Sequence, residues 1–335
     1  MKKLLVFSVG MCVLVTMVAA YWVMQPDRVR VELGGPMARL EGVTDARSLQ
    51  LSNAVDALAF TPSGDELVVL TKSRESDNAR HVLRTQIDGS GSVELHSTFD
   101  VLIGLALSPK GDHAYTGVWR VGADKLGGLL KIDALAGGVD QRIPSAPLDG
   151  FGFAITSDIV TMGISADGTR VAAGSKLVDD EYVAGGHIGS EISVWDTDMG
   201  EVLWRNRTVH TDIIRSVVFS PDGERLYSAG EDSLIRVWDA QSGELERTLV
   251  GALWDGAASM DISPDGRYLV TGGQGREDGG RVRVWDLSEG KPIRLFTPFQ
   301  RESIVSVTFC ADGTLVAAGT AKTGTAETPL FELHT

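Results

Sequence analysis

The sequence is poor in cysteine and in clustered metal ligands. Its only cysteines are Cys12 and Cys310, and no CxxC pair occurs. Two cysteines cannot form a disulfide framework, and a structural zinc site is disfavoured without a Cys/His cluster. The six histidines lack zinc-protease spacing, and no GxSxG motif occurs. The sequence therefore predicts no catalytic constellation, no metal site and no cofactor.

Positive charge is also scarce. The chain carries 31 Lys and Arg against 45 Asp and Glu, which gives a net charge of −14 and an isoelectric point near 4.9. Such a surface repels the phosphate backbone of nucleic acids, and it repels anionic lipid head groups as well. We therefore predict no nucleic-acid partner, and any membrane contact should depend on one segment of the chain.

The N-terminus supplies such a segment. Lys2 and Lys3 precede an uncharged stretch from Leu4 to Met24, which as a helix of about 1.5 Å per residue could span a bilayer core. We expect residues 1–26 to be a signal-anchor helix or, alternatively, a signal peptide cleaved after Ala20, which ends a Val-Ala-Ala run. We expect residues 27–45 to be a linker. Either reading places residues 46–335 outside the cytoplasm, on the periplasmic side of a bacterial inner membrane.

Six internal repeats follow. Each has an apolar alternating strand, a tight turn and a second strand, as in IRSVVFSPDGERLYSAG. Pro and Asp before Gly are typical of a hairpin turn. The turn glycines are Gly64, Gly111, Gly168, Gly223, Gly266 and Gly313.

A third strand completes three of the repeats with Val-Trp-Asp, ending at Asp196, Asp239 and Asp286. The interval from each of these acids to the next turn glycine is 27 residues in all three cases. An internal period of about 40–50 residues with four strands per unit predicts an all-β propeller of four-stranded antiparallel blades.

The repeat over residues 210–250 resembles the WD40 family closely, and the resemblance extends more weakly over residues 46–335. It implies a structural hydrogen-bonded set of a loop His, a second-strand Ser, an Asp and the third-strand Trp. These positions are occupied by His210, Ser228, Asp232 and Trp238. The other repeats lack the His, so packing should hold them.

Closure of the ring is predicted from the C-terminus, because the last repeat stops after its third strand. An open sheet edge favours aggregation, so a strand near Ala46–Leu51 should close the blade. Residues 29–43 are then a linker, or an extra strand over Val29–Leu33. Six turn motifs favour six blades; seven remains the alternative.

Extra residues collect at one end of the disc. The first–second turns are uniform, so the additions should lie in the second–third loops and in the link near Phe151, at the same end of each blade. Loops on a rigid scaffold commonly carry binding residues. The candidate binding-face residues are Trp119, Arg120, Phe151, Phe153, Asp179, Asp180, Tyr182, His187 and Trp254.

The sequence therefore predicts a non-enzymatic scaffold that binds a protein or peptide through this face, as a monomeric propeller within a complex. Two alternatives remain. One is a propeller enzyme (hydrolase, lactonase or dehydrogenase-like) with an axial site, and the other is a carbohydrate-binding or surface-sensing domain.

Overall fold

The computed structural model describes the strands and turns of most of the chain, with side chains described within residues 56–309. The described backbone comprises residues 2–9, 12–13, 28–32, 38–40, 46–51, 54–73, 79–86, 91–119, 128–144, 155–179, 187–207, 210–249, 258–273, 280–296, 302–309, 315–321 and 330–334. These residues contain no helix, so none of the described segments is a helix that could cross a membrane.

Five four-stranded antiparallel sheets, here sheets 1 to 5, each use consecutive strands, which confirms the predicted all-β architecture. Sheet 1 contains β6 (Ala54–Phe60), β7 (Glu66–Lys72), β8 (Arg80–Gln86) and β9 (Ser92–Thr98); sheet 2 contains β10 (Val101–Leu107), β11 (His113–Trp119), β12 (Gly128–Asp133) and β13 (Val139–Pro144); sheet 3 contains β14 (Ile155–Ile164), β15 (Arg170–Asp179), β16 (His187–Asp196) and β17 (Val202–Arg207); sheet 4 contains β18 (Ile214–Phe219), β19 (Arg225–Gly230), β20 (Ile235–Asp239) and β21 (Leu245–Leu249); sheet 5 contains β22 (Ser259–Ile262), β23 (Tyr268–Gly273), β24 (Arg281–Asp286) and β25 (Lys291–Phe296).

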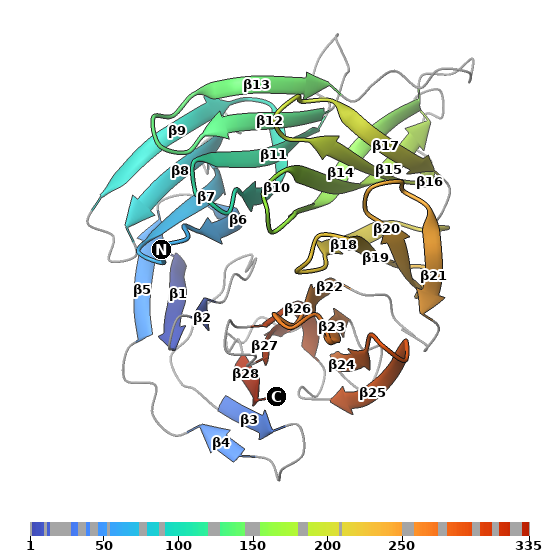
Figure 1. Cartoon of the computed structure of the whole chain (residues 1–335). Helices are drawn as coiled ribbons and strands as arrows, with labels where there is room; N and C mark the ends of the chain where they lie inside the picture. Colours follow the sequence, from blue (N-terminus) through green and yellow to red (C-terminus); the bar gives the residue numbers. More distant parts are fainter. Residues whose placement is uncertain are drawn as a thin grey trace.

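The sheets follow one another around a common centre, with the first strand of each innermost (Figure 1). Contacts join the successive first strands β6, β10, β14, β18, β22 and β26 (Glu302–Phe309). This arrangement of radially stacked meanders fits a β-propeller.

The last sheet differs from the predicted closure. Its order is β26, β27 (Leu315–Ala321), β28 (Leu330–His334), β3 (Arg28–Glu32) and β4 (Ala38–Leu40). The strand beside β28 is β3, in parallel register, and not Ala46–Leu51. That segment, β5, instead pairs antiparallel with β1 (Lys2–Val9) in a separate three-stranded sheet. The alternating Val-Arg-Val of β3 fits a half-buried strand, which explains why it can take this place.

The predicted N-terminal helix is not confirmed. Within that stretch the structure describes two strands, β1 and β2 (Cys12–Val13), and the remainder lies outside the described residues. Apolar runs rich in Val, Leu and Phe are ambiguous between helix and strand when only periodicity is considered, and here β5 supplies a pairing partner.

The first–second turns follow from local chemistry and are five residues long in every repeat. In sheet 4, Gly223 adopts a φ of 73°, which side chains rarely tolerate, and its N–H donates to Ser220 O at 2.8 Å. Ser220 Oγ donates to Asp222 Oδ1 at 2.5 Å. This bond, together with the N–H of Glu224, lowers the pKa of Asp222. The described turn glycines Gly64, Gly111, Gly168 and Gly266 also have positive φ, as the turn motifs predict.

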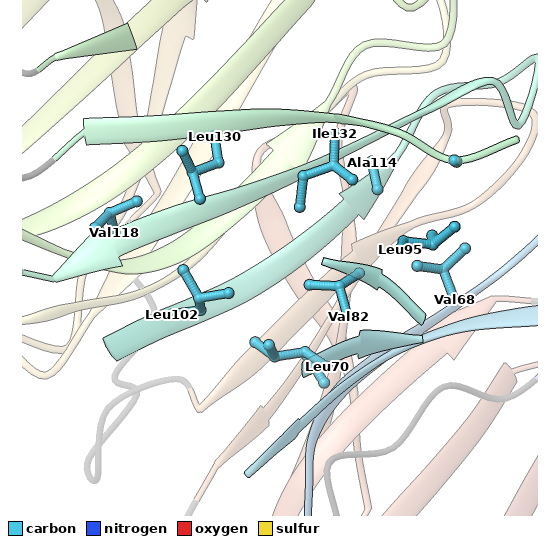
Figure 2. Packing of buried hydrophobic residues seen from close by; sticks show 11 residues of the cluster. Val68, Leu70, Val82, Leu95, Leu102, Ala114, Val118, Leu130 and Ile132 are labelled. Carbon is cyan, nitrogen blue, oxygen red and sulfur yellow. The ribbon is translucent and has the colours of Figure 1, made fainter. Parts of the chain in front are cut away.

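Apolar seams hold neighbouring sheets together. Between sheets 1 and 2, Leu70 and Val82 pack with Leu102, Val118 and Leu130, all buried (Figure 2). Burying each such side chain contributes roughly 1.5–3 kcal/mol. The core is therefore a series of seams between sheets.

A repeated hydrogen bond reinforces these seams. In four successive seams, a side chain of one sheet donates to the carbonyl of the residue that follows the third-strand acid of the next sheet. The donors and acceptors are Arg84 Nη1 to Ala134 O (3.2 Å), Lys131 Nζ to Thr197 O (3.0 Å), Trp204 Nε1 to Ala240 O (3.0 Å) and Arg247 Nη2 to Leu287 O. Three residue types serve one acceptor position, which explains why no sequence motif marks this bond.

Candidate functional site

Sheet 4 contains a buried polar network built from the loop before β18 and from strands β19 and β20. His210 Nε2 lies 2.8 Å from Ser228 Oγ, and His210 Nδ1 lies 2.9 Å from Asp232 Oδ1. The indole Nε1 of Trp238 donates to Ser228 Oγ at 2.9 Å. The structure thus brings together all four residues that the WD40 resemblance implies.

Two further residues belong to this network and were not predicted. Arg236 Nη1 lies 2.9 Å from Asp232 Oδ2 and 2.8 Å from His210 Nδ1. Ser190, on the neighbouring sheet 3, donates its hydroxyl to His210 O at 2.9 Å. Arg236 could have been found from the sequence, because a residue two positions before Trp238 in a strand shares its face. Ser190 could not, because its contact joins two different repeats.

Burial and charge set the protonation of the network. The side chain of Asp232 is only 3% exposed, and burial alone would raise its pKa. Hydrogen bonds and charge from His210 and Arg236 outweigh burial and lower the pKa of Asp232 to about 2. The pKa of His210 is lowered, chiefly by burial and against the opposing effect of Asp232. His210 is therefore neutral and Asp232 ionised at neutral pH.

The network is structural in kind. His210, Ser228 and Trp238 are all 0% exposed, so no substrate can reach the hydroxyl or the imidazole. Its polar atoms are satisfied within the network, as buried polar groups require.

The other sheets retain only parts of this network. In sheet 5, Trp285 Nε1 donates to Thr271 Oγ1 at 3.2 Å, and Thr271 occupies the register position of Ser228. In sheet 3 that position is Ala173, and the buried Nε1 of Trp195 has no hydrogen-bond partner among the described residues. Among the described sheets, sheet 4 therefore contains the most complete version of this network.

His210 and Ser228 are fully buried, and a second contact of a histidine with an acid and a serine in the described residues lies on sheet 1. His81 Nδ1 is 2.8 Å from Glu94 Oε2 and 3.2 Å from Ser97 Oγ. Both partners meet the same ring nitrogen, whereas a catalytic relay needs the nucleophile and the orienting acid on opposite nitrogens. No group of three or more His, Cys, Asp or Glu within the described part of the chain could hold a metal ion.

Chain length varies mainly at one end of the sheets. The second–third connections contain seven or eight residues in the repeats other than sheet 4, where the connection contains four. The links between sheets vary from two residues after β9 to ten after β13 and lie at the same end, because the strands alternate in direction. We call this end the long-loop end, and the end with the five-residue first–second turns the turn end.

Three of the candidate binding-face residues lie at strand ends on the long-loop end. Trp119 ends β11, Asp179 ends β15 and His187 begins β16. The expectation that sheet 3 adds a loop here needs correction, because most of its extra residues lengthen β15 and β16 to ten residues each. Their antiparallel pairing continues through this added length. Arg120, Phe151, Phe153, Asp180, Tyr182 and Trp254 lie outside the described residues.

The comparison with protein families agrees with this geometry. The model of the WD domain, G-beta repeat (WD40) matches residues 203–239 and 243–286, which span β17 to β24. Residues 203–286 therefore contain WD40 repeats, and propellers of the WD40-repeat family are generally non-catalytic scaffolds for protein interactions. No curated protein matches the chain.

Proposed function

We propose that this chain is a non-enzymatic scaffold that binds a protein or peptide partner through its long-loop end. In this proposal the sheets form a six-bladed ring closed by the N-terminal strand β3 beside β28. The ring supplies rigid support, and the variable connections supply the contact residues.

One observation carries the proposal: variation in length is concentrated at a single end. Every first–second turn is five residues long, while the second–third connections and the links vary. Neutral insertion would lengthen tolerant loops at both ends. Trp119 ends β11, and by sequence Arg120 and Tyr182 belong to second–third connections; aromatic and Arg residues are the types most often found as interface anchors.

The test is a matched pair of variants of the full chain. Trp119→Ala with Tyr182→Ala removes two anchors at the long-loop end, and Leu135→Ala with Met199→Ala removes two exposed apolar side chains at the turn end. Proteins crosslinked to each variant in membrane extracts are quantified against wild type. We expect a specific partner to be lost with the first pair and retained with the second; retention with both pairs contradicts the proposal.

We further propose that the propeller is displayed outside the cytoplasmic membrane, anchored by residues 1–26 or released after cleavage at Ala20. The support is the sequence pattern of two lysines followed by an uncharged apolar run. Alkaline phosphatase fused after Pro26 should be active in bacteria, because the enzyme needs an oxidising compartment. An inactive fusion that is present at normal abundance contradicts export.

A further inference from the structure

The outer strand of sheet 5 is unusually exposed. In sheets 1 to 4 the outer strand buries at least one side chain against the next sheet, namely Leu95, Ile143, Trp204 and Leu249. In β25, by contrast, five consecutive residues from Lys291 to Leu295 are exposed, and Phe296 is half-buried. Ile293 is 46% and Leu295 50% exposed, so β25 presents apolar side chains to solvent.

The charge of β25 differs from that of the protein. Lys291 and Arg294 are exposed cations on a strand without an acid, in a chain whose net charge is −14. On the adjacent outer strand of sheet 4 and the turn before it, Glu244 and Glu246 are exposed acids that flank Leu245, which is 47% exposed. Two adjacent outer strands therefore carry exposed aliphatic side chains with opposite charges.

The neighbouring ion pairs leave this contrast in place. Glu246 accepts a hydrogen bond from Arg225 Nε at 2.8 Å, and Lys291 Nζ lies 3.9 Å from Glu289. Both are exposed pairs, which contribute little and exchange partners easily. Sheets 4 and 5 are held in fixed relation by a buried cluster that includes Leu249, Met260 and Trp285.

Direct strand addition is disfavoured at both outer strands. A β-bulge interrupts the pairing of β21 between Val237 and Trp238, and another interrupts the pairing of β25 between Val284 and Trp285. Pro292 additionally removes a backbone donor from β25. Bulges and proline protect sheet edges from pairing with another chain, so a partner here must contact side chains.

We propose that this rim strip, formed by Glu244, Leu245, Glu246, Lys291, Ile293, Arg294 and Leu295, binds a second copy of the chain. An acidic partner would attract β25 and be repelled by β21, and a basic partner would do the reverse. A second copy related by a twofold axis parallel to the disc axis brings β21 of each protomer against β25 of its partner. Each complementary contact then occurs twice.

This surface is separate from the long-loop end and departs from the monomer expected from the sequence. The aliphatic side chains of the two strips would bury one another, and the flanking charges would fix the register of the contact. Charge complementarity of this kind gives specificity more than affinity, so the dimer should be weak and sensitive to salt.

The experiment is a charge swap followed by sedimentation equilibrium of the full chain in density-matched neutral detergent at low salt. Wild type should show a monomer–dimer equilibrium. Glu244→Lys and Lys291→Glu should each weaken association about tenfold, because each change acts twice at a twofold interface. The double variant should recover the wild-type association, because the swapped charges attract again. Every substituted position is exposed, so folding should be retained.

Lys110→Glu is the matched control, because Lys110 is an exposed cation in the first–second turn of sheet 2. It should leave association unchanged. A wild type that remains monomeric at all concentrations overturns the proposal. A dimer whose association is unchanged by the single charge swaps also overturns it, as does a failure of the double variant to restore association. Crosslinking of a partner protein to the variant carrying Trp119→Ala and Tyr182→Ala is measured separately. This proposal and the binding-face proposal can therefore fail independently.

Discussion

The indole N–H of Trp238 donates a 2.9 Å hydrogen bond to the hydroxyl of Ser228, and both side chains are fully buried. The same hydroxyl lies 2.8 Å from His210 Nε2, so one Ser connects the third strand of sheet 4 to the loop that enters it. The network fixes that loop at the long-loop end, where the partner is proposed to bind.

His210→Ala should lower the free energy of unfolding by roughly 1–3 kcal/mol, because Ser228 and Asp232 would be left buried without this partner. Urea unfolding followed by tryptophan fluorescence measures the change. Thr211→Ala, at an exposed neighbouring position, serves as the control and should change stability by less than about 0.5 kcal/mol. Equal losses in both variants would show that the network does not stabilise the fold.

Stability should fall in acid through Asp232. Its folded-state pKa of about 2 lies below the ordinary value of 3.8, so its contribution is complete above the ordinary value and is lost as pH falls through about 2. Between about pH 5 and about pH 2, wild type should lose about 2 kcal/mol more than Asp232→Asn. Parallel pH profiles for the two proteins, from urea unfolding, would contradict this assignment.

His210 adds a second pH dependence with the same sign. Its pKa is lowered in the folded state from the ordinary 6.5, so the unfolded chain takes up a proton first as pH falls. Stability should therefore decline as pH drops below about 6.5, and this decline should be absent from His210→Ala. A decline of equal size in both proteins would assign it to other groups.

Ala173→Ser should stabilise the chain by about 1 kcal/mol, because it supplies a hydroxyl to the buried Nε1 of Trp195. The matched control is Ala172→Ser, also fully buried but on the opposite face of β15, among apolar neighbours. That hydroxyl should destabilise the fold. Thermal melts compare the two variants, and the same shift in both would refute the assignment.

Trp204→Phe tests the hydrogen bond across the seam between sheets 3 and 4. The change keeps an aromatic ring but leaves the carbonyl of the buried Ala240 without its 3.0 Å partner, so it should cost about 1–3 kcal/mol. Leu203→Ala, next to it and 42% exposed, should cost less than about 0.5 kcal/mol in the same urea titration. A smaller loss for Trp204→Phe than for Leu203→Ala would show that the bond is dispensable.

The parts of the fold that could be predicted from the sequence depend on local chemistry. Pro-Asp-Gly predicts the turn at Gly223 with positive φ, and the Trp238 strand with its regular spacing predicts the repeated sheets. The His210 network could be proposed only through family resemblance, since its members are separated along the chain. Ser190 could not be assigned to it, because its contact joins two repeats.

The N-terminal region was the least predictable part. Pairing of β3 with β28 joins segments about 300 residues apart, and no local pattern specifies its parallel direction. The apolar alternation of β3 was consistent with a strand, yet β5 offered an equally good closing segment. The choice between them depends on packing in the finished sheet rather than on propensity.

Binding of a partner at the long-loop end can be tested by photocrosslinking from the two ends of one strand. Benzoylphenylalanine in place of Arg120 lies just after β11, and in place of Lys110 it lies just before β11 in the first–second turn. After irradiation of cells, adducts are identified by mass spectrometry. We expect a discrete protein adduct from position 120 and none from position 110. An adduct from position 110 alone, or from neither position, would contradict it.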